Sequence, residues 1–224
     1  LPDNGAFLHL RERVRVLTAA GPTEALRHYE RNAMPAEPMA ARAWRYGQAL
    51  ALTRAGQTDQ AAAELAALSA NAADFLPYRV AKVELAMANK QPAAAATLAR
   101  EDLKLYPDNL SLQLLLAESE LRAGHPATTR SVLGARAHQA QPAPPVLELL
   151  ARAAEARGDK IEAFQMRAEY HVQNGRLELA MEQLRRASKL QPIAFAQLAT
   201  IDARLRQLQD DLEFERQFFG RRAL

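Results

Sequence analysis

Histidine and cysteine side chains most readily hold metals or act as nucleophiles, and this chain offers little of that chemistry. It contains no cysteine, which excludes thiolate metal sites and cysteine nucleophiles. A helix presents a pair of metal ligands on one face when two histidines lie three or four residues apart. No two of the five histidines have that spacing, so we interpret each as a surface or partly packed residue. They are His9, His28, His125, His138 and His171.

Other catalytic patterns give no stronger signal. The sequence has no G-x-S-x-G nucleophile elbow and no phosphate-binding loop. The carboxylate pair Asp210-Asp211 lies in a charged stretch, which is typical of a solvated helix face. We therefore expect no catalytic residue, no metal site and no cofactor in this chain.

The composition of the 224 residues indicates a packed helical protein. Alanine is abundant and β-branched residues are sparse, which favours helix over sheet. No apolar run reaches the roughly 20 residues of a membrane span. Arginines alternate with glutamates, as in residues 10–15, and the net charge is only +3, so no basic stripe suggests nucleic-acid binding. Residues 1–5 have neither an initiator methionine nor a signal-peptide pattern, so we interpret this end as processed or truncated.

Turn residues recur with the period of the tetratricopeptide repeat. Gly56, Lys90, Gly124 and Gly158 are each 34 residues apart, and each follows a predicted first helix. Glycine suits this place because it takes the left-handed conformation without a Cβ penalty, so Lys90 departs from the pattern. Small residues are expected where the paired helices cross. On the first helices these are Ala49, Val83, Ala117 and Ala151, and on the second helices they are Ala61, Ala95, Thr129 and Ala163.

These signals predict an all-α fold, a tetratricopeptide-repeat solenoid of antiparallel helix pairs with a long C-terminal capping helix. We expect one repeat domain over residues 1–224, divided into an N-terminal helix pair (1–37), the repeats (38–192) and the capping helix (193–224). Turns at Gly158 and Gly175 lie half a period apart, so the helix between them closes one pair and opens the next. The capping role follows from an apolar stripe, for which a short coiled-coil dimer is the alternative. The stripe consists of Leu198, Ile201, Leu205, Leu208 and Leu212.

Two stretches of the second half resemble one known family. They are residues 145–171, which end in the phrase Ala-Glu-Tyr-His, and residues 174–187, which begin Asn-Gly-Arg-Leu-Glu. They are similar to the C-terminal repeat domain of the β-barrel assembly-enhancing proteases, periplasmic zinc metallopeptidases of the HtpX-related class. Three further stretches fit the same domain, at residues 7–18, 106–118 and 201–208.

The resemblance implies that the chain is the non-catalytic repeat half of a zinc metalloendopeptidase. The family's catalytic half carries an H-E-x-x-H helix that binds zinc, and this sequence lacks that motif, so zinc is expected in a separate catalytic domain. By the same resemblance we expect a periplasmic protein. Its expected partners are the β-barrel assembly machinery, outer-membrane protein substrates and its own protease domain.

A groove lined by the first helix of each pair is the expected binding surface. Some of the groove positions, the apolar ones above all, could instead pack between repeats. Reversal of Glu84 and Glu118 to lysine is expected to weaken partner binding. The full set of predicted groove residues is Tyr46, Leu50, Glu84, Met87, Glu118, Leu121, Arg152 and Glu155.

Three roles remain open from the sequence. The domain could recruit external partners, dock on its own protease domain and gate the protease cleft, or act as an adaptor in an unrelated complex. The lysines and asparagines with which some repeat proteins grip chaperone C-terminal carboxylates are missing from these faces, which disfavours that partner class.

Overall fold

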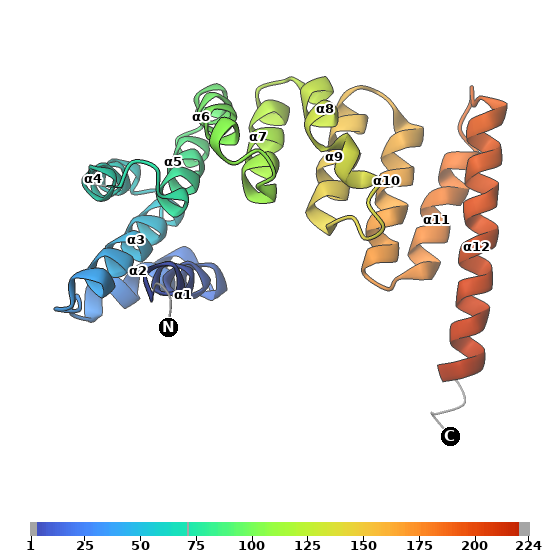
Figure 1. The fold of residues 1–224 in the computed structure, drawn as a ribbon. Coiled ribbons are helices and arrows are strands. Elements are labelled where there is room, and N and C mark those ends of the chain that lie inside the picture. Colours follow the sequence, from blue (N-terminus) through green and yellow to red (C-terminus); the bar gives the residue numbers. More distant parts are fainter. Residues whose placement is uncertain (1–3, 71, 220–224) are drawn as a thin grey trace. The chain divides into compact units, whose positions relative to one another are not determined.

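A computed structural model describes residues 4–70 and 72–219 of the chain, and this part contains twelve α-helices and no β-strand (Figure 1). The chain divides into two compact units, Leu1–Ser119 and Glu120–Leu224. The first unit holds α1 (Asn4–Thr18), α2 (Pro22–Arg31), α3 (Pro38–Arg54), α4 (Thr58–Ser69), α5 (Leu76–Ala88), α6 (Pro92–Leu105) and most of α7 (Leu110–Arg122). The second holds the end of α7, α8 (Pro126–Ala137), α9 (Pro144–Ala156), α10 (Lys160–Gln173), α11 (Leu177–Ser188) and α12 (Phe195–Phe219).

Each unit is built from consecutive helices that pack on their chain neighbours, which confirms the predicted all-α helical-repeat fold. In the first unit α3 packs on α4 and α5 on α6, as the period predicts. In the second unit α10 packs on both α9 and α11, so this helix closes one pair and opens the next. The predicted division of residues 1–224 into a single domain with three parts stays a prediction.

Left-handed residues end the helices at the predicted turns. The φ angles are +76° at Gly56, +86° at Gly124, +81° at Gly158 and +67° at Gly175. Lys90 takes the same conformation, with φ +56°, although it has a Cβ atom. The turn geometry is therefore kept at the one repeat where the sequence departs from glycine, at a conformational cost.

The small residues predicted at the helix crossings are all buried. All eight positions, from Ala49 to Ala163, expose no more than 2% of their surface. Such contact suits a small side chain because larger ones would push the helix axes apart. The repeat register read from the sequence is therefore correct in both units.

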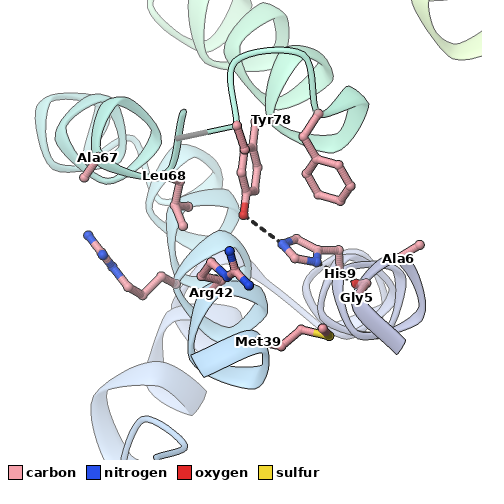
Figure 2. Close-up of a pocket in the computed structure, with 11 residues that line it drawn as sticks. Gly5, Ala6, His9, Met39, Arg42, Ala67, Leu68 and Tyr78 are labelled. Carbon is pink, nitrogen blue, oxygen red and sulfur yellow. Dashed lines mark hydrogen bonds between the residues drawn. The ribbon is translucent and has the colours of Figure 1, made fainter. Parts of the chain in front are cut away.

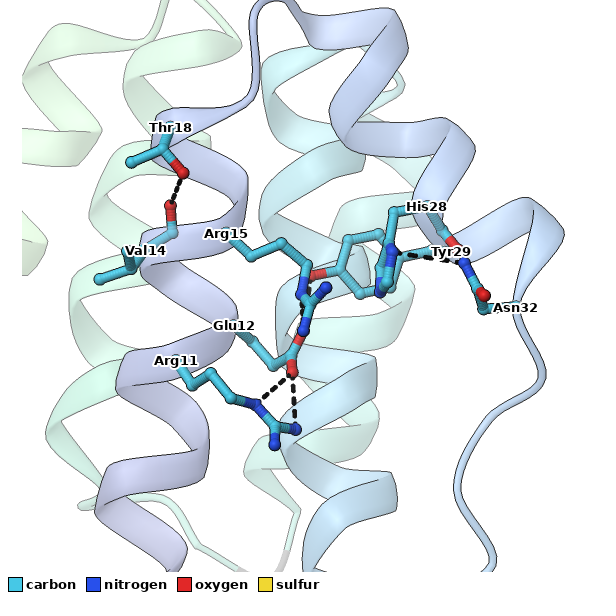
Figure 3. Close-up of polar contacts among 8 residues, drawn as sticks. All are labelled: Arg11, Glu12, Val14, Arg15, Thr18, His28, Tyr29 and Asn32. Atoms are coloured by element: carbon cyan, nitrogen blue, oxygen red, sulfur yellow. Dashed lines mark hydrogen bonds and ion pairs between the residues drawn. The ribbon is translucent and has the colours of Figure 1, made fainter.

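A buried carboxylate ties α1 to α2. The Glu12 side chain, 1% exposed, accepts a hydrogen bond of 3.0 Å from the Tyr29 hydroxyl (Figure 3). Arg11 and Arg15 pair with the same carboxylate at 2.9 and 3.1 Å, which compensates the cost of burying its charge. Gly47 of α3 makes room for this arrangement, because a Cβ atom there would lie 2.1 Å from the Tyr29 hydroxyl oxygen.

The apolar stripe of α12 packs on α11 in the second unit, as expected of a capping helix. Ile201 and Leu208 are fully buried, and Leu205 and Leu212 pack partly buried beside them. Their partners on α11 include Leu184. Four of the five stripe residues thus pack within the chain, whereas Leu198 is half-buried and lies outside this cluster.

Candidate binding site in the first unit

His9 of α1 is the centre of an aromatic cluster, so the prediction that it is a surface or partly packed residue was wrong. Only 5% of the residue is exposed. Its ring centroid lies 5.3 Å from that of Tyr46, 4.8 Å from Phe75 and 5.4 Å from Tyr78. The imidazole can be buried because both ring nitrogens have partners, Nδ1 at 2.7 Å from the Gly5 carbonyl and Nε2 at 3.0 Å from the Tyr78 hydroxyl.

The tautomer of His9 follows from these partners. A carbonyl oxygen only accepts, so Nδ1 carries the hydrogen and donates to Gly5. In the neutral form of the ring, Nε2 accepts from the Tyr78 hydroxyl. Burial raises the pKa of Tyr78, although the charges of Arg42 and Arg45 oppose this, so its hydroxyl stays protonated and able to donate near neutral pH. The ring of His9 is held in one orientation between α1 and α5.

An apolar cavity of about 320 Å³ lies on one side of His9 (Figure 2). Its walls come from α1, α3, the end of α4 and the loop before α5. The apolar lining residues are Ala6, Met39, Ala67, Leu68, Ala72 and Phe75. Ala6 and Ala67 are exposed, so the cavity opens to solvent.

Two arginines line the same cavity, and only one is neutralised. The Arg45 Nε atom donates to the Glu64 carboxylate at 2.8 Å. Arg42 is exposed and forms no hydrogen bond or ion pair with any residue in the described ranges. The cavity therefore combines apolar walls with one arginine that has no hydrogen bond or ion pair with a described residue.

A second cavity, of about 170 Å³, shares Ala6 and His9 with the first. Arg13 lies in it and donates to the Tyr46 hydroxyl at 3.3 Å and to Glu84 Oε2 at 3.1 Å. Burial lowers the pKa of Arg13, but the hydrogen bond and the charge of Glu84 outweigh this, so the pKa is raised overall. This contact joins α1, α3 and α5.

The outer face of α1 carries a stripe of large apolar side chains that are exposed. The stripe follows the helical spacing of three and four residues, while the opposite face of α1 holds the buried residues His9, Glu12 and Val16. The exposed residues are Phe7 (63% exposed), Leu10 (58%), Val14 (50%) and Leu17 (59%). We call these four residues the α1 stripe. Leu10 also lines the second cavity, so the stripe and the cavity are continuous.

The predicted groove residues of the first unit fall into two groups. Tyr46 and Leu50 are buried in the core, and Tyr46 meets Glu84 through Arg13. Met87 and Glu118 are half-buried, and Met87 Sδ accepts a hydrogen bond of 3.0 Å from Ser119.

Leu121, Arg152 and Glu155 belong to the second unit. Leu121 is half-buried on α7, whereas Arg152 and Glu155 are exposed on α9, and Glu155 pairs with Arg167 at 2.6 Å. That any of the eight residues binds a partner stays a prediction.

Sequence reasoning missed the residues that shape the two cavities, namely His9, Arg13, Phe75 and Tyr78. They belong to α1 and to the start of α5, and the repeat register assigns no groove position to them. One available signal was the apolar spacing of the α1 stripe, which stands beside a second, buried face of the same helix.

No group of three or more metal-ligating side chains occurs among residues 4–70 and 72–219. Within the same ranges, no helix is both long and apolar enough to cross a membrane. No model of a known protein family matches the chain, and no curated protein matches it in sequence.

Proposed function

We propose that this chain is a protein-binding helical-repeat domain and that its first unit binds a partner through the surface around α1. The observation that carries the proposal is the α1 stripe, four large apolar side chains that are each at least half exposed. Contiguous apolar surface on a soluble fold is typical of a site that another molecule covers.

The form of this surface favours a polypeptide partner. The α1 stripe runs along three turns of helix, which suits a groove or a helix of another protein better than a compact small molecule. The two cavities beside it can each take a side chain of the partner, because inserted side chains supply most of the energy at protein interfaces.

The resemblance to the β-barrel assembly-enhancing proteases supports a more specific proposal. On this proposal the chain is the non-catalytic repeat domain of a periplasmic zinc metalloprotease, and it recruits the β-barrel assembly machinery or its outer-membrane protein substrates. Intramolecular docking on the protease domain is the second candidate. The apolar α1 stripe is compatible with this candidate too, because such a face suits a neighbouring domain of the same protein as well as an external partner.

Substitution within the α1 stripe tests the proposed surface. We expect the double variant Leu10→Asp/Leu17→Asp to bind purified β-barrel assembly complex at least tenfold more weakly. In the complex the partner would cover two charged side chains in place of two apolar ones, and each charge would lose its hydration. Biolayer interferometry measures the affinity, and circular dichroism checks that the helices remain. Leu105→Asp is the matched control, since Leu105 is 55% exposed on α6 and lies outside the stripe. Equal affinity of the double variant and the control would show that the α1 stripe is not part of the interface.

Charge reversal at Glu84 needs a compensated variant. Glu84→Lys places a second positive charge beside Arg13, so the variant alone loses stability as well as any partner contact. The swap Arg13→Glu/Glu84→Arg restores an ion pair between α1 and α5. If the swap binds the complex normally while Glu84→Lys does not, the carboxylate acts through stability and contributes no direct contact.

The two candidate roles differ in their effect on proteolysis. The separately expressed catalytic domain of a protease from the resembled family is mixed with this chain and with the Leu10→Asp/Leu17→Asp variant. Intramolecular docking predicts that only the wild-type chain changes the rate of cleavage of an unfolded substrate. External recruitment predicts that both mixtures cleave at the rate of the catalytic domain alone.

A further inference from the structure

The cavity beside His9 joins an apolar chamber to a free cation. Arg42 lines it from α3, and the guanidinium forms no hydrogen bond or ion pair with a described residue. Figure 2 shows Arg42 projecting from α3 on the side where the Tyr78 hydroxyl meets His9. The charges of Arg42 and Arg45 both act on the Tyr78 hydroxyl, and Tyr78 also lines the cavity.

Two carboxylates of the same region already accept hydrogen bonds from other groups. Glu64 accepts from Arg45 at 2.8 Å. Glu37, which interacts electrostatically with Arg42, caps α3 by accepting from the backbone N–H groups of Met39 at 2.9 Å and Ala40 at 2.6 Å. These backbone hydrogen bonds lower the pKa of Glu37 and hold its carboxylate at the start of the helix. Within residues 4–70 and 72–219 no carboxylate forms an ion pair with Arg42, so a ligand can supply one.

We propose that this cavity binds a polypeptide segment in which a large apolar side chain stands next to a carboxylate. The side chain fills the chamber between Met39, Leu68 and Phe75, and the carboxylate pairs with Arg42 at the mouth. The carboxylate is either the C-terminus of the segment or an adjacent Asp or Glu. The inference rests on the proposed function as a protein-binding domain and names the chemistry of one of its ligands.

The cavity is large enough to admit a large apolar side chain of a ligand. A volume of about 320 Å³ is at the lower end of the roughly 300–1,000 Å³ typical of ligand pockets. The arrangement also differs from the rows of lysine and asparagine with which some repeat proteins hold a C-terminus. Here one arginine pairs with the carboxylate and the apolar chamber supplies the remaining affinity.

Fluorescein-labelled peptides of glycine and serine provide the test with the whole chain. One peptide ends in phenylalanine with a free carboxylate, the second is its C-terminal amide, and the third is an amide with an internal Phe-Asp pair. A fourth ends in glycine with a free carboxylate. Fluorescence anisotropy up to millimolar protein gives each Kd for the wild type, Arg42→Gln, Ala67→Trp and the control Arg27→Gln, an exposed arginine on α2.

We expect the free-carboxylate phenylalanine peptide to bind about tenfold more tightly than its amide, and the glycine peptide to bind more weakly than both. Arg42→Gln removes the preference for the carboxylate, Ala67→Trp weakens both phenylalanine peptides by filling the chamber, and Arg27→Gln changes neither. The internal Phe-Asp peptide assigns the source: affinity equal to the free-carboxylate peptide identifies an acidic side chain, and affinity equal to the amide identifies a C-terminus.

Equal affinity for the carboxylate and the amide, a preference that survives Arg42→Gln, or no saturation by any peptide would each overturn the inference. The proposed function is tested separately, because its variants at Leu10 and Leu17 leave Arg42 and the chamber walls unchanged. Loss of complex binding in those variants together with no carboxylate preference would leave the protein-binding role standing without this ligand.

Discussion

Gly47 shows how one missing side chain permits a buried carboxylate to accept from a tyrosine. A glycine inside a helix normally costs about 0.5–1 kcal/mol relative to alanine. At position 47 a change to alanine does not recover this cost. An added Cβ atom there would lie 2.1 Å from Tyr29 and 2.9 Å from the Glu12 side chain. The overlap would displace Tyr29 from the carboxylate that it stabilises.

We therefore expect Gly47→Ala to destabilise the protein by about 1–3 kcal/mol, the usual cost of overpacking. The change is measured by urea denaturation followed by circular dichroism. Gly134→Ala is the matched control, since Gly134 lies in α8 and an added Cβ atom there meets nothing within 4 Å. That control should gain about 0.5–1 kcal/mol from helix propensity. A stable Gly47→Ala protein would show that Tyr29 moves at little cost.

His171 of α10 gives the second unit a dependence on pH. Its Nδ1 atom is buried without a hydrogen-bond partner among the described residues. Burial lowers the pKa of His171, and the charge of Arg176 adds to this. The folded state therefore binds fewer protons than the unfolded state, whose histidine titrates near 6.5. The stabilising contribution is complete above that value and is lost as the pH falls below it.

Replacement by glutamine removes this titration. We expect the free energy of unfolding of His171→Gln to fall less than that of the wild type between pH 8 and pH 5, when each protein is referred to its own value at pH 8. Chemical denaturation at several pH values measures the difference. His28, whose pKa is also lowered by burial, remains in both proteins, so a reduced slope and not a flat one is expected. Identical slopes would assign the pH dependence to other groups.

Individual core and site residues could be predicted from the sequence only at positions that recur with the 34-residue repeat. The positions from Ala49 to Ala163 were found because one small side chain per crossing recurs every 34 residues. His9 was not found, because burial of a histidine depends on a carbonyl and a hydroxyl that lie far apart in the sequence. Arg13 and Tyr46 were likewise joined only by the packing of α1 on α3.

Among the elements, the turn after α5 departs from its equivalents in having Lys90 where the others have glycine. A residue with a Cβ atom in this left-handed conformation costs roughly 1–2 kcal/mol, and the greater freedom of glycine in the unfolded chain offsets part of that. We expect Lys90→Gly to stabilise the protein by about 0.5–1 kcal/mol, measured as a higher denaturation midpoint.

The neighbouring residue provides the control for this turn. Asn89 has φ −73°, a value that any residue adopts, so Asn89→Gly should destabilise the protein. If both glycine variants changed stability in the same direction, the left-handed conformation at Lys90 would not be the cause.

Helix boundaries were the most predictable elements. The predicted turns at Gly158 and Gly175 flank α10 as expected, because glycine marks the ends of helices. Which face of α1 lies inward was not predictable in the same way. The helix carries apolar residues on both faces, and only contacts with α3 and α5 decide between them.

For the whole molecule, the division into two compact units predicts that a destabilising substitution in one unit leaves the stability of the other unchanged. Leu208 is fully buried in the second unit, so Leu208→Ala should cost about 2–5 kcal/mol there. We expect it to raise amide hydrogen exchange in α11 and α12 while Gly47→Ala raises exchange in α1 to α3. Hydrogen–deuterium exchange with mass spectrometry measures both. Spreading of either effect through all twelve helices would mean that the chain unfolds as one cooperative body.

The anchoring of α1 affects how quickly a partner can associate. Three contacts hold its inner face: Glu12 accepts from Tyr29 of α2, Arg13 donates to Glu84 of α5, and the Val16 carbonyl accepts from Arg54 of α3. A partner therefore meets a preformed face and loses no binding energy to ordering it. Association should be a single kinetic phase whose rate rises linearly with concentration, with no slow step of rearrangement in this chain.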